Sequence, residues 1–186
     1  MPIITVTLIE GYDKQARQRL CERLTDATCS VINAPAELVT VVVNEVPAEN
    51  YMRGRVGRQP GPALADQAQL VQDYLTAMEN RDLEKARGFL APDFRMVFPG
   101  GVVFTEVEQL IEWAKGRYQS IAKTYEHFDQ CVSADGVTVY CAGTLSGVWP
   151  DQTEFSGIRF IDRFTVADGL LVDQQVWNDI AEVHGV

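Results

Sequence analysis

The first residue that could carry chemistry is Pro2, which follows the initiator methionine and precedes a β-branched run. Removal of Met1, which a small second residue normally permits, would leave a secondary amine at the tip of a strand. Apolar surroundings disfavour the ammonium form of such an amine, so Pro2 could act as a general base near neutral pH. If Met1 is retained, the proline nitrogen is acylated and cannot act as a base. The alternative is a structural proline, because proline is tolerated at the first residue of a strand.

The second candidate is Asp162, which lies in a segment of alternating character, residues 156–166. One face of a strand here carries Ile158, Phe160, Asp162, Phe164 and Val166. A two-residue turn at Asp168 and Gly169 would place Asp162 opposite Gln175 on the next strand. A carboxylate on an apolar sheet face suits the acid or base of a pocket. The alternative is a structural aspartate that is hydrogen-bonded by Gln175 or by a tyrosine hydroxyl.

Pro2 would be positioned by a small strand, helix, strand unit. Residues 2–8 and 38–43 are β-branched runs, and residues 14–33 have apolar positions at helical spacing. Asp13 is placed to cap the helix, and Ala34-Pro35 to end it. A crossover of this length predicts a right-handed βαβ unit with parallel strands. Such a unit buries little surface alone, so we expect copies of the chain to form a homo-oligomer through it.

Asp162 would be positioned by a second, larger unit. Residues 53–65 are rich in Arg, Gly and Pro without periodicity, which predicts an irregular linker. We therefore expect domains at residues 1–58 and 66–186, with a linker at 59–65. The second domain has expected helices at 66–80, 83–90 and 106–123, a strand at 94–98, and two hairpins with turns at Ala134-Asp135-Gly136 and Ala167-Asp168-Gly169. This order predicts an α+β fold, with helices on one face of a curved antiparallel sheet.

Several short segments of the first unit carry a family resemblance: Pro2-Ile3-Ile4, Glu10-Gly11, Ala34-Pro35, Val41-Val42-Val43-Asn44-Glu45 and Asn50-Tyr51. Together they are similar to the 4-oxalocrotonate tautomerase family, over residues 2 to about 58. The resemblance implies an enzyme whose amino-terminal proline, Pro2, is the general base. Such a base moves a proton between carbons of an enol or dienol acid.

Two positions depart from the type member of this family. The arginines that anchor substrate carboxylates or carbonyls there are replaced by Tyr12 and Thr40, and neither can form a bidentate cationic clamp. Tyr51 matches the active-site aromatic residue of the family. Arg53 and Arg55 could supply replacement cations, or they could simply be solvated in the linker. A dicarboxylate is therefore a poor candidate for the substrate.

A second resemblance is carried by Leu90-Ala91-Pro92-Asp93-Phe94, residues 157–164, Asp168-Gly169 and Val176-Trp177-Asn178-Asp179. These segments are similar to the SnoaL-like branch of the nuclear-transport-factor-like superfamily, over roughly Asp66 to Glu182. The resemblance implies a cone of curved sheet closed by helices around a pocket, a fold used by enzymes and by non-enzymatic binding proteins.

Within this pocket we expect Asp162 to be catalytic and Tyr74, Tyr140 and Trp177 to line the wall. His127 could share a face with Tyr140 and add a polar group to the lining. The alternatives are tryptophans that belong to the core and a histidine with a structural role.

Composition limits the partners and the cofactors. The 186 residues carry a net charge of −10, all of it in residues 66–186, which argues against a nucleic-acid binder. No phosphate-binding loop, metal-ligand cluster or membrane-spanning run is present in the sequence, so we expect no cofactor, no metal and a cytoplasmic protein. The cysteines have no metal-ligand spacing and are expected to be reduced and buried: Cys21, Cys29, Cys131 and Cys141.

Three functions stay open on the sequence alone. The first is a tautomerase that uses Pro2 on a carbonyl or enol compound, fused to a pocket domain that binds or processes a related molecule. The second is a catalytically silent oligomerisation module that carries a ligand-binding domain, which the missing arginines favour. The third places the enzyme wholly in the second unit, as an isomerase or cyclase with Asp162 as its base.

Overall fold

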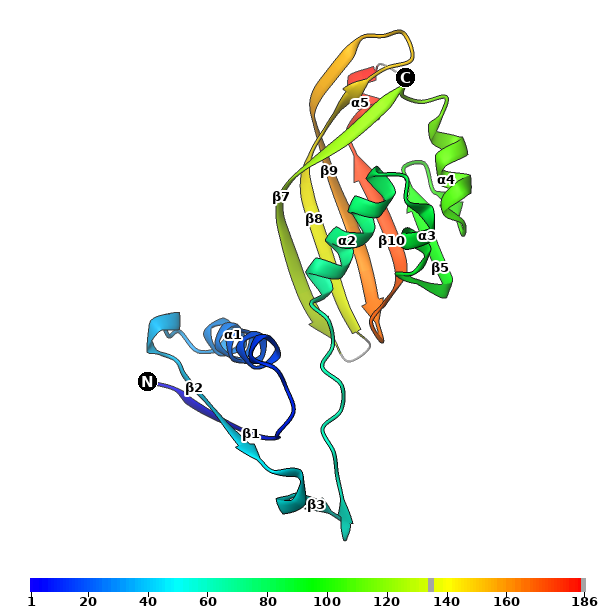
Figure 1. Ribbon diagram of the computed structural model, residues 1–186. Coiled ribbons are helices and arrows are strands. Elements are labelled where there is room, and N and C mark those ends of the chain that lie inside the picture. Colours follow the sequence, from blue (N-terminus) through cyan, green and yellow to red (C-terminus); the bar gives the residue numbers. More distant parts are fainter. Residues whose placement is uncertain (134–135, 185–186) are drawn as a thin grey trace. The chain divides into compact units, whose positions relative to one another are not determined.

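The computed structural model describes residues 1–133 and 136–184. The chain divides into two compact units, Met1–Leu64 and Ala65–Val186 (Figure 1). Both mix helices and strands, as the expected α+β class requires. The first of the two predicted hairpin turns centres on Ala134 and Asp135, which lie outside the described residues.

The first unit has the expected parallel βαβ arrangement. β1 (Ile3–Ile9) pairs in parallel with β2 (Thr40–Val46), and α1 (Lys14–Val31) connects the two strands. The Asp13 carboxylate accepts a hydrogen bond of 2.7 Å from the Ala16 amide, so it caps α1 as predicted. The helix ends at Val31 rather than near Asn33, because the backbone of the next residue is already extended.

Part of the predicted irregular linker is ordered as a hairpin. After η1 (Ala36–Leu38), β2 and η2 (Ala48–Asn50), the chain forms β3 (Met52–Arg53) and β4 (Val56–Gly57), which pair antiparallel. The φ angles of Gly54 and Arg55 are 57° and 69°. A tight two-residue turn requires this left-handed backbone. The segment therefore forms a hairpin through its turn, although its sequence has no alternating apolar pattern.

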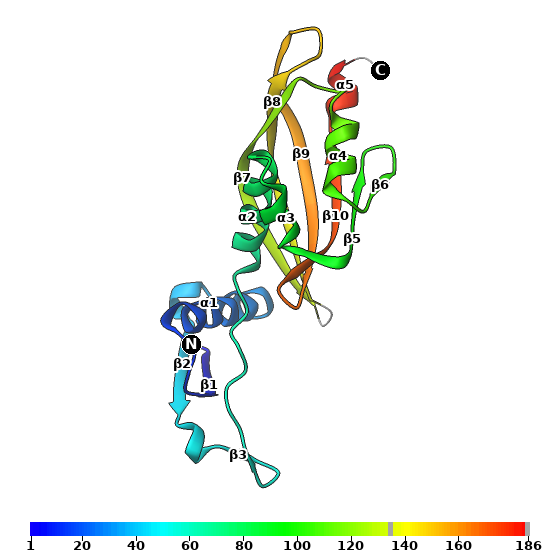
Figure 2. The same ribbon diagram turned by 45° about the vertical axis from the view of Figure 1, so that its right-hand side comes forward.

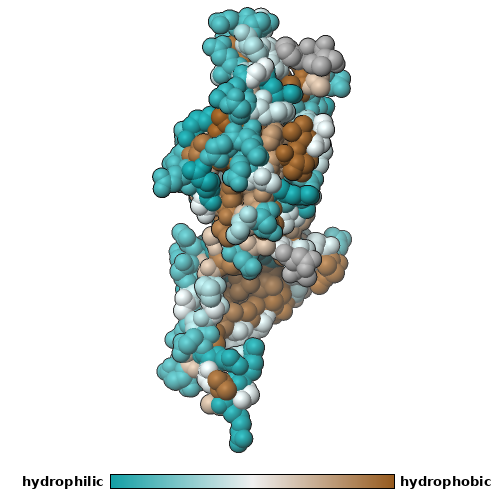
Figure 3. Space-filling model, turned by 90° about the vertical axis from the view of Figure 1, so that its right-hand side faces the viewer, coloured by the Kyte–Doolittle hydropathy of each residue, from teal (hydrophilic) through white to brown (hydrophobic). Residues whose placement is uncertain are grey.

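The first unit has no enclosed core. All residues from 1 to 64 are described, and none of them is buried. Figure 3 shows a broad apolar area on this unit. The large apolar side chains that remain exposed are Met1, Ile3, Val31, Ile32, Leu38, Val42, Met52, Val56 and Leu64.

The second unit is built on a six-stranded sheet with the order β6-β5-β10-β9-β8-β7. Neighbouring strands run antiparallel, except β5 and β10, which are parallel. The helices α2 (Gln67–Glu79), α3 (Leu83–Arg87) and α4 (Val107–Ala114) lie over one face of the curved sheet (Figures 1 and 2), and α5 (Ile180–His184) follows the last strand. The strands are β5 (Leu90–Phe98), β6 (Val102–Phe104), β7 (Ser120–Ser133), β8 (Gly136–Val148), β9 (Glu154–Ala167) and β10 (Leu170–Asn178).

Three boundaries in this unit differ from the sequence prediction, and one is the end of the helix expected over residues 83–90, which stops at Arg87. The helix expected to reach Lys123 ends at Ala114, and β7 begins at Ser120, because a long ladder with β8 pairs the later residues. The strand expected from Phe94 begins at Leu90. Pro92 is tolerated there because neither neighbouring strand pairs with it.

The core of the second unit lies between the helices and the inner face of the sheet. Its largest fully buried side chains include Tyr74, Met96, Phe164 and Leu171. All four cysteines are free, as expected, but the expectation that all are buried is wrong: Cys141 is buried, whereas Cys131 is exposed on β7.

Candidate functional site

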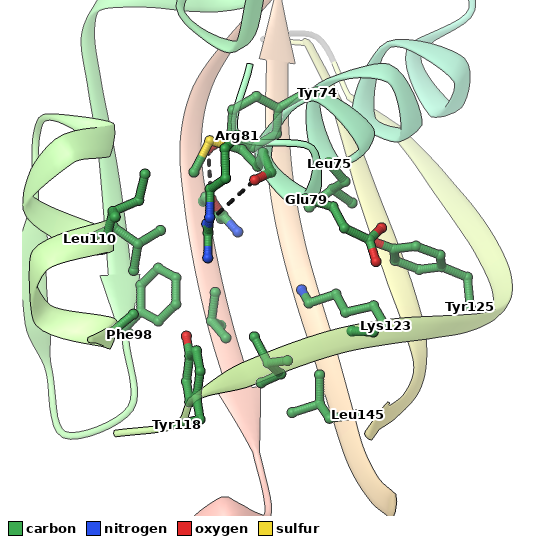
Figure 4. A pocket seen from close by; sticks show the side chains of 17 residues that line it. Tyr74, Leu75, Glu79, Arg81, Phe98, Leu110, Tyr118, Lys123, Tyr125 and Leu145 are labelled. Atoms are coloured by element: carbon green, nitrogen blue, oxygen red, sulfur yellow. Dashed lines mark hydrogen bonds between the residues drawn. The ribbon is translucent and has the colours of Figure 1, made fainter. Parts of the chain in front are cut away.

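A pocket of about 150 Å³ lies between the helices and the inner face of the sheet in the second unit. A cavity of this volume can hold a single aromatic ring. Figure 4 shows that α2 contributes Tyr74 to its wall, α4 contributes Leu110, and β7 contributes Lys123, whose amino group points into the pocket. Most of the lining is apolar; the polar and charged lining residues are Tyr74, Glu79, Arg81, Tyr118, Lys123, Tyr125 and Gln174.

The charged centre of this site is an ion pair between Lys123 and Asp162. Asp162 on β9 is 0% exposed, and its Oδ2 accepts hydrogen bonds from Lys123 Nζ and, at 3.4 Å, from Gln174 Nε2. Its Oδ1 has no hydrogen-bond partner among the residues that the structure describes. Lys123 Nζ also lies 4.4 Å from the centre of the Phe160 ring, a cation–π contact. The ammonium therefore compensates a carboxylate whose burial would otherwise be costly.

Three tyrosine hydroxyls of the lining remain protonated at neutral pH. Burial raises the pKa of Tyr74 and Tyr125, and the negative charge of Asp162 raises both further. Burial also raises the pKa of Tyr118. The Tyr74 hydroxyl donates a hydrogen bond of 3.5 Å to Gln174 Oε1. These groups can therefore act as hydrogen-bond donors but not as anions.

Cys141 lies directly opposite Asp162 in the sheet, on β8. Burial, followed by the charge of Asp162, raises the pKa of its thiol from 9.0 to about 12. A thiolate is the reactive form of cysteine, so Cys141 is a neutral neighbour of the ion pair and not a nucleophile.

Asp162 faces inward, as the alternating pattern predicts, but its predicted cross-strand partner is wrong. It lies opposite Val176 and not Gln175, because a bulge between Leu171 and Asp173 inserts one extra residue into β10. The same bulge reverses the faces of the following residues. Trp177 is therefore 48% exposed on the outer face and does not line the pocket, which corrects that prediction.

His127 and Tyr140 also lie outside the pocket. A bulge between Tyr125 and His127 turns Phe128 inward in place of His127, whose Nε2 lies 3.3 Å from Asp129 Oδ2. Tyr140 faces outward because its neighbours on β8 occupy the buried face. Of the four pocket-lining residues expected in this unit, the structure places Tyr74 alone in the wall.

The residue that sequence reasoning missed is Lys123. It was assigned to the end of a helix, where a lysine is ordinary. The signal that could have found it is the alternation of Ile121, Lys123 and Tyr125, which has the period of a strand and puts all three on one face.

In the first unit, Pro2 and Thr40 lie together. The Pro2 carbonyl accepts a hydrogen bond of 3.0 Å from the Thr40 amide at the start of β2. Pro2 is half-buried, whereas Met1 is 87% exposed. A removed Met1 would therefore leave the proline nitrogen at the amino-terminal edge of the sheet.

The other predicted site residues of the first unit lie at the opposite end of the same sheet (Figure 1). Tyr12 follows β1, and its carbonyl accepts a hydrogen bond of 2.8 Å from Arg17 Nη1. Tyr51 and Arg53 follow β2, and Arg53 Nη2 donates a hydrogen bond of 3.2 Å to the Tyr51 hydroxyl. A single copy of the chain therefore does not bring Tyr51 and Arg53 to Pro2.

Neither a metal cluster nor a membrane span was found in the described part of the chain. No group of three or more His, Cys, Asp or Glu side chains there could hold a metal ion. No helix there is long and apolar enough to cross a membrane.

Comparison with known proteins agrees with this division of the chain. A family model described as a tautomerase enzyme matches residues 2–57, and one described as a SnoaL-like domain matches residues 71–174. A probable tautomerase of Ralstonia nicotianae is 45% identical over 51 residues, which are 27% of this chain and 73% of that protein. A probable tautomerase of Halalkalibacterium halodurans is 37% identical over 51 residues, 27% of this chain and 84% of that protein.

Solved structures match the second unit by fold. An NTF2-like protein of unknown function from Burkholderia pseudomallei superposes with a TM-score of 0.55 and 18% identity, over 64% of this chain and 95% of that one. TerC, crystallised with polyporic acid, superposes with a TM-score of 0.54 and 16% identity, over 63% of this chain and 94% of that one. At this level of identity the likeness concerns the fold alone.

Proposed function

The chain belongs to the tautomerase family through residues 2–57 and to the SnoaL-like family through residues 71–174, and from this premise we propose a tautomerase fused to a small-molecule pocket domain. The first unit moves a proton on an enol or 2-keto acid type compound, with the amine of Pro2 as the general base. The second unit binds a related carbonyl or enol compound in the pocket above Asp162. Copies of the chain assemble through the first unit.

The position of Pro2 carries this proposal. The family match begins at Pro2 itself, and the residue stands half-buried at the start of β1, with its backbone fixed by Thr40. The exposed Met1 leaves the Met1–Pro2 bond open to removal of the methionine. For the second unit, the pocket of about 150 Å³ and its largely apolar lining support a small organic ligand.

The test combines intact mass with the kinetics of enol–keto conversion. We expect the mass of a chain without Met1, and conversion of 2-keto acid enols by the purified protein. Pro2→Ala should lower kcat/KM by about 100-fold or more, the usual contribution of a positioned general base. The matched control is Pro35→Ala, an exposed proline before η1, which should leave the rate unchanged. Equal rates for Pro2→Ala and the wild type would overturn the proposal.

A second candidate is favoured by the residues at positions 12 and 40. With Tyr12 and Thr40 in place of the family's arginines, the first unit would be a silent oligomerisation module, and any chemistry would belong to the second unit with Asp162. A retained Met1 in the intact mass supports this candidate. Activity that survives Pro2→Ala but is lost in Asp162→Asn would assign catalysis to the pocket.

A further inference from the structure

The lining of the second unit's pocket carries two cationic side chains, Lys123 and Arg81, and one carboxylate, that of Glu79, which is an exposed residue. Its lining holds the ammonium of Lys123 and the hydroxyls of Tyr118 and Tyr125, which their raised pKa keeps protonated. One acceptor of the lining, Gln174 Oε1, already takes the hydrogen bond of Tyr74. A site of this kind favours a ligand that brings an electron-rich oxygen.

Lys123 stands between this space and Asp162. An ammonium group has three donors, and one of them is used by Asp162 Oδ2. The Phe160 ring flanks the same nitrogen at 4.4 Å, and the amino group points into the pocket (Figure 4). Asp162 is 0% exposed and is not part of the pocket wall, so a ligand would touch the ammonium and not the carboxylate.

The number and type of the donors limit the ligand's anionic group. A carboxylate is best recognised by the two-pronged guanidinium of an arginine. Arg81 also lines the pocket, and one 3.4 Å hydrogen bond from its Nη1 to the Met78 carbonyl uses one of five N–H donors, so Arg81 could hold a second, carboxylate group of the ligand. A compact ammonium on a long stem suits a single oxygen, such as that of an enolate or a phenolate. The pocket volume of about 150 Å³ leaves room for one six-membered ring.

We propose that Lys123 is the ligand-binding residue of this pocket, that it takes the enolate or phenolate oxygen of a ring-sized planar molecule, and that Asp162 is a positioning residue that fixes the ammonium. The inference rests on the proposed small-molecule function of the second unit and names its ligand class. It also changes the role of Asp162, which acts through Lys123 and does not itself contact the ligand.

The test uses the full-length protein and two probes of the same shape. Para-nitrophenol, above its own pKa, carries a single phenolate oxygen, and para-nitrotoluene has a methyl group in its place. Equilibrium dialysis gives the affinity for each. We expect the wild type to bind the phenolate more tightly than the neutral probe by about 10-fold or more, the value of a charge-assisted hydrogen bond.

The variants separate the charge from the fold. Lys123→Met together with Asp162→Asn removes both members of the ion pair at once, which avoids leaving a buried charge alone. This double variant should lose about 10-fold of its phenolate affinity or more and keep its affinity for para-nitrotoluene within about twofold. Lys115→Met, which removes an exposed lysine at the end of α4, is the control and should change neither affinity.

Asp162→Asn alone tests the positioning role. The preference for the phenolate over para-nitrotoluene should fall by about threefold or more, because the ammonium loses the charged oxygen that fixes its position. An unchanged preference in Asp162→Asn would overturn the positioning role. Equal losses for both probes in the double variant, or no loss, would overturn the role of Lys123 while leaving a ligand-binding pocket. A wild type that binds neither probe would overturn the small-molecule function and this inference with it.

Discussion

The two units of the chain place their apolar side chains in opposite ways. In the first unit no residue is buried, and β-branched side chains such as Ile3 and Val42 remain in contact with solvent. In the second unit the core residues Tyr74, Met96 and Phe164 are enclosed by one chain, and a pocket lies beside them. The second site is therefore complete within a single copy.

The first site is spread over the length of a strand. Thr40 lies beside Pro2 at one end of the sheet, whereas Tyr51 and Arg53 follow Val46 at the other end. From Thr40 to Val46 the strand spans about 20 Å at ~3.3 Å per residue. Parallel pairing thus separates the groups that the proposed reaction needs. Assembly would both cover the apolar surface and supply the missing groups from another copy.

The largest expected effect is a loss of oligomer assembly when a charge is introduced on the exposed sheet face of the first unit. Val42→Asp should convert an oligomer into smaller species, because desolvating an unpaired carboxylate costs about 3 kcal/mol or more and weakens association at least ~100-fold. Sedimentation velocity measures the change. Val103→Asp, at an exposed valine of β6 in the second unit, is the control and should leave the mass unchanged. A monomeric wild type would remove the contrast between the two units.

The second effect concerns the buried ion pair of the second unit. Lys123→Met should lower the free energy of unfolding by about 3–5 kcal/mol, because it leaves the Asp162 carboxylate buried with Gln174 as its remaining hydrogen-bond donor. Lys115→Met breaks an ion pair with Glu112 whose two side chains are mostly exposed, and it should cost less than about 1 kcal/mol. Urea unfolding monitored by near-UV circular dichroism compares the two. Equal losses of unfolding free energy in the two variants would mean that burial does not make the Lys123–Asp162 pair more stabilising than an exposed pair.

The third effect is a loss of stability of the second unit at alkaline pH, which we expect from the buried thiol of Cys141. Folding raises the pKa of the Cys141 thiol from 9.0 to about 12. The contribution of this thiol to the free energy of unfolding is therefore complete below pH 9 and is lost as the pH rises towards 12. Between pH 9 and 10 the free energy of unfolding should fall by up to about 1.4 kcal/mol per pH unit.

Cys141→Ala should flatten that slope, whereas Cys131→Ala, which removes an exposed thiol of the same sheet, should leave it as in the wild type. Urea unfolding at several pH values between 9 and 10 gives both slopes. A slope that is the same in all three proteins would assign the alkaline loss to other groups.

The sequence predicts those features that depend on local patterns. The βαβ order, the Asp13 cap and the inward face of Asp162 each follow from short-range spacing or from turn chemistry. The predicted helix to Lys123 was wrong because the long β7–β8 ladder, a tertiary effect, decides those residues.

The pocket lining was mostly missed because of single-residue insertions. The bulges in β7 and β10 each add one residue, and one added residue moves every later side chain to the other face. That is why His127 and Trp177 face outward and Gln174 faces Asp162. No glycine or proline stands in either bulge, so the sequence gives no local mark of it.

The smallest effect compares the same substitution in both units. Asp13 caps α1 through the Ala16 amide, and Asp66 caps α2 through the Ala68 amide at 2.9 Å. Replacing either by alanine should cost about 1 kcal/mol, the usual value of an N-cap. In the second unit this cost should appear as a lower free energy of unfolding at any protein concentration. If the first unit folds only on assembly, as proposed, the unfolding midpoint of Asp13→Ala should instead rise with protein concentration. Unfolding curves at two concentrations distinguish the cases, and a concentration-independent midpoint for Asp13→Ala would show that the first unit folds without its copies.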